Sequence, residues 1–239
     1  MKAELHNPNR RPKRARSARD GFTLIETSMA TVIIGVGVLA MVDAQSAFIV
    51  SNSWSSHAAS ATFLANEIRE LTRNLPKHDP VNGISLVDDG SGTMIISGWG
   101  VDAGESVVDD FDDIDDFDGV TFSYIGTPGL ADMDLPGPIN SFGEVIPGLS
   151  NDGVEQGSTS GGVFTGAAMV GWYQTVTVEK VHPFDTSLVL DEAFFEVPNG
   201  SFPGREVDEY PLRVSVEVFY QGVNDTTADL VTTVTWIVP

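Results

Sequence analysis

The chain has 239 residues, no cysteine, and 34 Asp and Glu against 13 Lys and Arg, which gives a formal net charge of −21 at pH 7. This length has room for one membrane helix and one soluble domain, and the lack of cysteine excludes a disulfide framework. The acidic balance argues against a soluble domain that binds nucleic acid or an anionic membrane surface.

Residues 1–21 form a basic segment that we predict to be a disordered, cleavable leader. The segment holds seven of the thirteen bases and two of the 34 acids, so the rest of the chain carries six bases and 32 acids. The seven bases are Lys2, Arg10, Arg11, Lys13, Arg14, Arg16 and Arg19. Positive charges before an apolar stretch predict a cytoplasmic N-terminus.

An apolar stretch follows at residues 22–42, in which Glu26 is the only ionisable side chain. As a helix, this stretch is about 31 Å long, close to the thickness of the hydrocarbon core of a bilayer. We therefore predict a single membrane span, with everything after Val42 on the far side. A carboxylate inside a span costs on the order of a few kcal/mol, so we expect Glu26 to have a functional partner.

The junction Gly21-Phe22-Thr23-Leu24-Ile25-Glu26, followed by the apolar stretch, resembles the processing signal of type IV pilins and type II secretion pseudopilins. The resemblance implies that a prepilin peptidase cuts between Gly21 and Phe22 and that Phe22 is then N-methylated. It also implies that Glu26 neutralises the new ammonium of a neighbouring subunit in a filament. The expected partners are other pilins or pseudopilins, the peptidase, the inner-membrane assembly platform, and membrane lipid along 22–42.

Two other interpretations of the N-terminus remain open. One is an ordinary secretory signal peptide, cut near Val42-Asp43-Ala44, and the other is an uncleaved signal anchor. The length of the apolar stretch and the position of Glu26 argue against an ordinary signal peptide. The pilin-type signal is the preferred interpretation of the three. The corresponding location is the bacterial inner membrane, with the C-terminal domain in the periplasm or in an extracytoplasmic filament.

Residues 43–75 are predicted to continue the helix as an amphipathic periplasmic segment. Apolar residues recur there at spacings of three and four, which places them on one helix face. They are Ala61, Leu64, Ile68, Leu71 and Leu75. Pro76 is expected to end the helix, because the residue before a proline disfavours the helical conformation.

Residues 76–239 are predicted to form a soluble domain with an antiparallel β-sheet. Alternating or β-branched segments predict hairpins at 84–87 with 94–99 and at 212–220 with 230–238. Single strands are predicted at 120–124 and 172–181, whereas 126–162 is rich in Gly, Pro, Asp and Ser and is predicted to be loop. The fold class is therefore α+β, with a long N-terminal helix packed on a C-terminal antiparallel sheet, as the resemblance to pilins also implies.

The acidic loop 109–118 is the most unusual local feature of this domain. Calcium binds six to eight oxygen ligands, which several of these carboxylates can supply. The candidate calcium ligands are Asp112, Asp113, Asp115, Asp116 and Asp118. The spacing does not match an EF-hand, and the alternative is a solvated loop that Phe111, Ile114 and Phe117 anchor to the domain.

No catalytic constellation is found in the chain. The four histidines are far apart in sequence, and Gly157-Ser158-Thr159-Ser160-Gly161 has Thr159 where a nucleophile elbow needs serine, so we expect a flexible loop there and no enzyme. The predicted function is a structural subunit of a type II secretion pseudopilus or a type IV pilus. The alternative is a minor tip pilin whose sheet domain binds a substrate or a surface. The long irregular insertions favour a minor subunit, and the lack of cysteine favours a pseudopilin.

Overall fold

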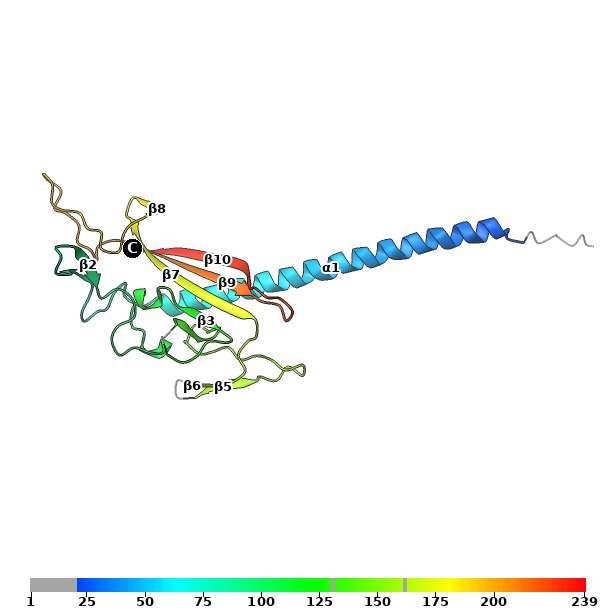
Figure 1. Ribbon diagram of the computed structural model, residues 1–239, viewed down its shortest axis with the longest axis horizontal. Helices are drawn as coiled ribbons and strands as arrows, with labels where there is room; N and C mark the ends of the chain where they lie inside the picture. The colour runs from blue at the N-terminus through cyan, green and yellow to red at the C-terminus, as the bar shows by residue number, and fades with distance from the viewer. Residues whose placement is uncertain (1–20, 130–131, 161–162) are drawn as a thin grey trace, which may run out of the picture. The chain divides into compact units, whose positions relative to one another are not determined.

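The computed structural model describes residues 21–129, 132–160 and 163–239 (Figure 1). The predicted leader, apart from Gly21, lies outside the described residues. The chain divides into two compact units, one that ends at Asn52 and one that comprises Ser53–Pro239.

Helix α1 comprises Leu24–Thr72 and confirms the prediction of one long N-terminal helix. Thr23 caps its start, because the Thr23 hydroxyl oxygen accepts the backbone N–H of Glu26 at 3.3 Å. The helix ends three residues before Leu75-Pro76. Its N-terminal part is long and apolar enough to cross a membrane, although signal sequences near an N-terminus share these properties.

The unit Ser53–Pro239 is built on one sheet with the strand order β10-β9-β7-β3-β4, in which β3 is Thr121–Ser123 and β4 is Asp134–Pro136. Its central strands are β7 (Trp172–His182) and β9 (Leu212–Tyr220), and β10 (Asp229–Val238) forms one edge. The pairs β7–β9 and β9–β10 are antiparallel over nearly their whole length. The alternation of apolar and polar residues predicted the β9–β10 hairpin and the strand β7, but not the pairing of β7 with β9. The short β8 (Asp185–Val189) pairs with the end of β7.

The prediction that 126–162 is entirely loop is wrong. Strand β4 (Asp134–Pro136) pairs with β3 (Thr121–Ser123), and this pair is parallel within an otherwise antiparallel sheet. Leu135 is the only buried residue of β4, so the strand is too short to produce a periodic pattern in the sequence.

A second hairpin was also missed. Strands β5 (Gly157–Ser160) and β6 (Val163–Gly166) pair in antiparallel fashion, so Gly157–Ser160 is a strand and not the flexible loop expected there. Thr159 is the one β-branched residue of β5, and the glycine and the two serines beside it gave no strand pattern, which is why the sequence did not indicate this strand. The predicted hairpin of β1 (Ser85–Asp88) and β2 (Met94–Ser97) is confirmed.

The core of this unit lies between the C-terminal part of α1 and one face of the sheet. The helix contributes Ala61, Leu64, Ala65 and Ile68, all nearly inaccessible to solvent. Alternate residues of β7 and β9 pack on the same core because successive side chains of a strand point to opposite faces. They include Val176, Val178, Val214, Val216 and Val218. The second half of α1 is therefore an integral part of the sheet domain.

Candidate functional site

The N-terminal junction lies at the beginning of α1. Phe22 is 83% exposed, and Gly21 and Glu26 are exposed as well. Within the described part of the chain, the Glu26 carboxylate has no hydrogen-bond or ion-pair partner. The spacing Thr23-x-x-Glu26 is a helix-capping pattern, and the cap it forms fixes where the helix begins.

Every residue from Gly21 to Ser56 is exposed in the isolated chain. The segment includes large apolar side chains on all sides of the helix, such as Leu24, Ile33, Leu39 and Phe48. A monomeric soluble protein rarely exposes so large an apolar surface, because its contact with water is unfavourable. This part of α1 is therefore suited to surroundings of lipid or of other protein.

The acidic loop 109–118 is folded into the domain. It contains two short 3₁₀ helices, η1 (Val108–Asp110) and η2 (Asp115–Phe117). Phe111, Ile114 and Phe117 are buried in the core, which confirms the predicted anchoring.

The expectation of a solvated acidic loop is wrong for three of its members. Asp113, Asp115 and Asp116 are at most 2% exposed, because the anchoring of the apolar residues between them draws their side chains inside. Asp112 remains exposed, and Asp118 is half-buried.

Hydrogen bonds within the loop hold two of the buried carboxylates. One oxygen of Asp116 accepts the backbone N–H groups of Asp112 and Asp113 at 3.0 and 3.2 Å. Asp113 in turn accepts the N–H of Asp116 at 3.1 Å. These reciprocal bonds close the loop around η2.

Asp118 connects the loop to two other segments. Its carboxylate accepts the indole N–H of Trp99 at 3.1 Å and the backbone N–H of Val178 at 2.8 Å. Both oxygens of Asp118 thus stabilise the fold, which distinguishes this residue from the other candidate calcium ligands.

Burial shifts the protonation equilibria in this region. It raises the pKa of Asp113 to about 9, that of Asp116 to about 7 and that of Asp115 to about 6. It also lowers the pKa of His78 to about 4, although His78 Nδ1 lies 3.1 Å from a carboxylate oxygen of Asp115. For His78 and Asp115, the cost of removing a charge from water therefore exceeds the gain from their mutual attraction. Burial thus favours the uncharged form of both side chains.

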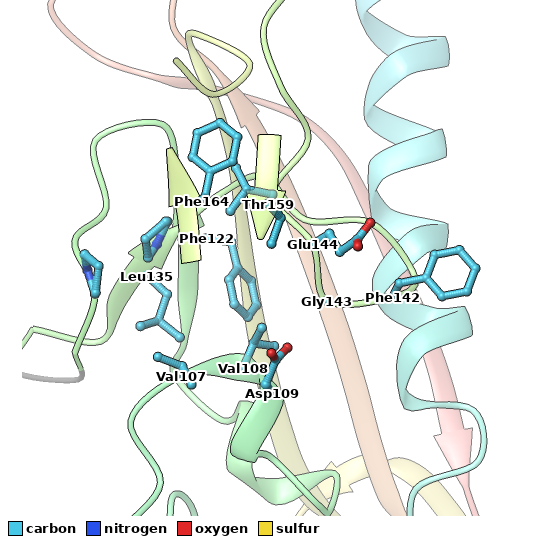
Figure 2. A pocket seen from close by; sticks show the side chains of 13 residues that line it. Val107, Val108, Asp109, Phe122, Leu135, Phe142, Gly143, Glu144, Thr159 and Phe164 are labelled. Atoms are coloured by element: carbon cyan, nitrogen blue, oxygen red, sulfur yellow. The ribbon is translucent and has the colours of Figure 1, made fainter. Parts of the chain in front are cut away.

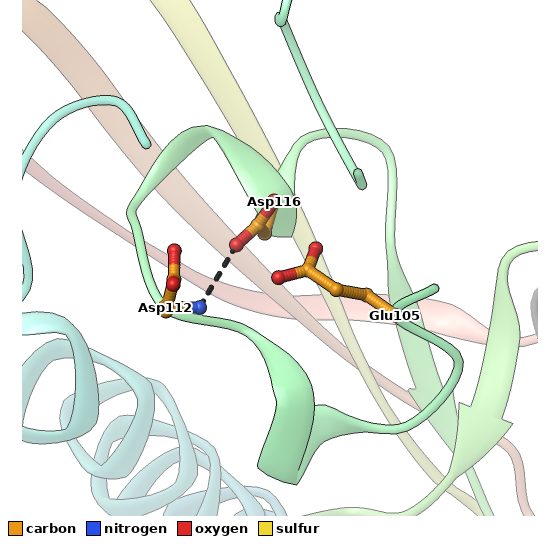
Figure 3. A group of neighbouring side chains, drawn as sticks. All are labelled: Glu105, Asp112 and Asp116. Carbon is orange, nitrogen blue, oxygen red and sulfur yellow. Dashed lines mark hydrogen bonds between the residues drawn. The ribbon is translucent and has the colours of Figure 1, made fainter. Parts of the chain in front are cut away.

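Figure 3 shows the group of carboxylates whose geometry is suited to a cation. Single oxygen atoms of Glu105, Asp112 and Asp116 all lie within 4.8 Å of one another. The structure thus brings together two of the five predicted calcium ligands and adds Glu105, which the sequence analysis missed because it precedes the acidic run. Asp113, Asp115 and Asp118 are outside this group. Oxygen ligands of this kind suit Ca²⁺, and calcium binding remains a prediction.

Comparisons with known proteins provide no assignment. No protein-family profile matches the chain, and neither a curated protein nor a solved structure is significantly similar to it. The functional conclusion therefore depends on the N-terminal junction and on the structure.

Proposed function

We propose that this protein is a structural subunit of a type II secretion pseudopilus or a type IV pilus. A prepilin peptidase removes the leader after Gly21, and the chain assembles through the N-terminal part of α1. It resides in the bacterial inner membrane by its single span, with the leader in the cytoplasm and the sheet domain in the periplasm or in an extracytoplasmic filament.

One observation supports this proposal above all. A single helix, Leu24–Thr72, begins as a fully exposed apolar segment and ends as part of the core of the sheet domain. An ordinary signal peptide is removed without loss to the mature fold, whereas here the apolar segment continues directly into a structural helix. Such a continuous helix suits a subunit that moves from the membrane into a filament, where neighbouring helices cover the apolar surface.

The partners follow from the same segment. Cleavage after Gly21 creates an ammonium on Phe22. The carboxylate of Glu26, which has no partner among the described residues, is available to a neighbouring subunit. In a low-dielectric filament core, such a pair is far more stable than either charge alone. Other pilin-type subunits, the peptidase and an inner-membrane assembly platform are the proposed partners.

A minor tip subunit is the second candidate function. The chain between β2 and β7 contains long irregular segments in addition to the strands of the sheet. These segments line a pocket that is described below. A subunit at the tip of a filament would present such a surface to a substrate.

The N-terminus of the protein extracted from membranes tests the proposed processing. Intact mass and N-terminal sequencing are expected to identify N-methylated Phe22 as the first residue. Glu26→Gln is expected to leave this processing unchanged and to reduce filament assembly about tenfold or more, because the neighbour's ammonium loses its counter-charge.

Assembly is measured as the fraction of the protein that sediments with filaments and crosslinks to a second tagged copy. Glu70→Gln, on an exposed part of the same helix, is the matched control and is expected to assemble normally. A mature N-terminus at Met1 or Gln45, or normal assembly of Glu26→Gln, would contradict the proposal.

A further inference from the structure

A pocket of about 280 Å³ opens beside the parallel strands β3 and β4 (Figure 2). Its floor is made by Phe122 and Leu135, which belong to the core and are at most 2% exposed. Val108 and Phe164 contribute to its walls from η1 and β6. The interior is thus apolar and is built by segments that are far apart in the sequence.

Acidic and aromatic side chains surround this apolar interior. Asp109 and Glu144 both line the pocket, and Phe142 beside them is 80% exposed. None of the described residues that line the pocket is basic. A ligand that fills the interior and carries a positive charge would therefore meet two carboxylates without a competing cation of the protein.

A well-bonded turn positions one side of the pocket. The side-chain oxygen of Asn140 accepts the backbone N–H groups of Phe142 and Glu144 at 2.9 and 3.1 Å. The neighbouring Ser141 N–H is bound by Glu67 of α1 at 2.6 Å, so the turn is attached to the helix. The residues that this turn carries are held in place before any ligand arrives.

Gly143 allows the turn to approach the opposite wall closely. Its φ is +77°, a conformation that favours glycine, and an added Cβ would lie 3.3 Å from a methyl carbon of Val108 and 3.6 Å from an oxygen of Asp109. A larger residue at this position would narrow the space between the turn and η1.

We propose that this pocket binds a large apolar side chain that stands next to a lysine or arginine in a partner polypeptide. A cavity of about 150 Å³ is enough for benzene, so the larger volume here has room for one aromatic or branched side chain. The carboxylates of Asp109 and Glu144 then face the adjacent base.

A second copy of this chain is a poor occupant. Only six bases follow Asp20, and five of them already bind carboxylates or carbonyl groups of their own chain. These five are Arg73, Lys77, Lys180, Arg205 and Arg213. The partner is therefore a different and more basic polypeptide.

This inference is independent of the proposed assembly. Every residue of the pocket belongs to the unit Ser53–Pro239, and nothing in its geometry depends on cleavage after Gly21. Loss of peptide binding would therefore contradict only the pocket inference, and loss of processing would contradict only the proposed function. The two can be measured separately on the same protein.

Capped dipeptides and methyl NMR spectroscopy of the full-length chain in lipid nanodiscs test the inference. N-acetyl-Phe-Lys-amide is expected to cause saturable shifts of the Val107, Val108, Leu135 and Val145 methyl groups. N-acetyl-Phe-Glu-amide is expected to bind at least about fivefold more weakly, because each exposed ion pair contributes a fraction of a kcal/mol. N-acetyl-Ala-Lys-amide, which lacks the ring, is expected to cause no saturable shift.

Two pairs of variants separate the pocket from general effects. Thr159→Phe fills the pocket from β5 and is expected to abolish binding, whereas Ser158→Phe, on the other side of the same strand, is expected to leave it unchanged. Asp109→Asn with Glu144→Gln is expected to remove the preference for Lys over Glu. Asp152→Asn with Glu155→Gln changes the net charge equally at exposed positions outside the pocket and is expected to keep that preference.

Some results would overturn the inference. They are the absence of saturable shifts with the Phe-Lys peptide, equal binding of the Phe-Lys and Phe-Glu peptides, and undiminished binding by a folded Thr159→Phe variant. If Thr159→Phe does not fold, the double variant Asp109→Asn with Glu144→Gln still tests the inference. A retained preference for Lys over Glu in this double variant would contradict the role assigned to the two carboxylates.

Discussion

Gln174 shows how one polar residue connects three parts of the sheet domain. It is completely buried near the beginning of β7, at a position where the alternation along the strand predicts an apolar residue. Its amide nitrogen donates to the backbone carbonyls of Leu64 in α1 and Ile139 at 2.8 and 3.2 Å. Its amide oxygen accepts the N–H of Ile139 at 2.7 Å. The helix, the sheet and the segment after β4 thus meet at one side chain.

Gln174→Leu is expected to lower the free energy of unfolding by about 2–4 kcal/mol. The buried N–H and carbonyl of Ile139 would lose their partner, and unsatisfied buried groups are costly. Urea denaturation of the detergent-solubilised chain, followed by tryptophan fluorescence, measures the change. Thr177→Val, on the half-exposed face of the same strand, is the control and is expected to change stability by less than about 0.5 kcal/mol. Equal stability of the two variants would contradict the role of Gln174.

At the scale of elements, helix α1 has two parts that belong to different structural units. Up to Asn52 it belongs to a unit of its own, whereas from Ser53 onward it belongs to the sheet domain. The spacing of Ala61, Leu64 and Ile68 predicted the buried face of the second part, and these residues are in the core. Long periodic elements such as α1, β7 and β9 were therefore predictable from sequence, because each repeats the same local pattern many times.

A fragment that starts at Ser53 is expected to fold, and one that starts at Leu75 is not, because the shorter fragment lacks the helical part of the core. Circular dichroism with thermal melting distinguishes a cooperative transition from its absence. Within the longer fragment, Leu64→Asp is expected to abolish the transition, whereas Phe63→Asp is expected to preserve it, since Phe63 is 58% exposed. A cooperative melt of the shorter fragment would contradict this assignment of the helix to the core.

At the scale of the whole molecule, the dominant feature is an excess of negative charge, part of which is buried. Asp113 and Asp116 hold protons in the folded state at pH values where the unfolded chain has released them. The stability of the domain therefore depends on whether protons or a cation compensate these carboxylates.

Without divalent cations, stability is expected to fall as the pH rises from about 6.5 to 8. The folded pKa of Asp113, about 9, lies above its unfolded value, so the folded state binds more protons throughout this window. His78 opposes the trend near pH 6.5, where the unfolded imidazole is still partly protonated, and Lys180 opposes it near pH 8, because its folded pKa is about 8. The protons that Asp113 and Asp116 hold in the folded state outweigh both effects. The expected slope is about 1 kcal/mol per pH unit, measured by denaturation of the full-length chain in detergent.

Calcium at 10 mM and pH 8 is expected to raise the stability by about 1–3 kcal/mol if its dissociation constant is in the range typical of extracellular sites. Glu105→Gln with Asp112→Asn is expected to remove this gain. The equally charged control, Asp152→Asn with Glu155→Gln, is expected to keep it. An unchanged denaturation curve with and without calcium would contradict the calcium prediction and favour protons as the compensating charge.

The sequence by itself determined the features that depend on neighbouring residues. The junction from Gly21 to Glu26, the apolar stretch and the strand alternation are all local patterns, and local patterns predict helices and strands directly. The anchoring of the acidic loop by Phe111 and Phe117 was predictable for the same reason.

Only the tertiary structure decided which distant residues meet. The burial of Asp113 and Asp116, the approach of Glu105 to Asp112, and the pocket between Phe122 and Phe142 all join segments that no local pattern relates. Strand β4 also depends on tertiary contacts. Its pairing with β3 and the burial of Leu135 stabilise it more than the β-propensity of its own residues does. Burial and proximity depend on the packing of the whole domain, and the chemistry of its carboxylates therefore depends on that packing as well.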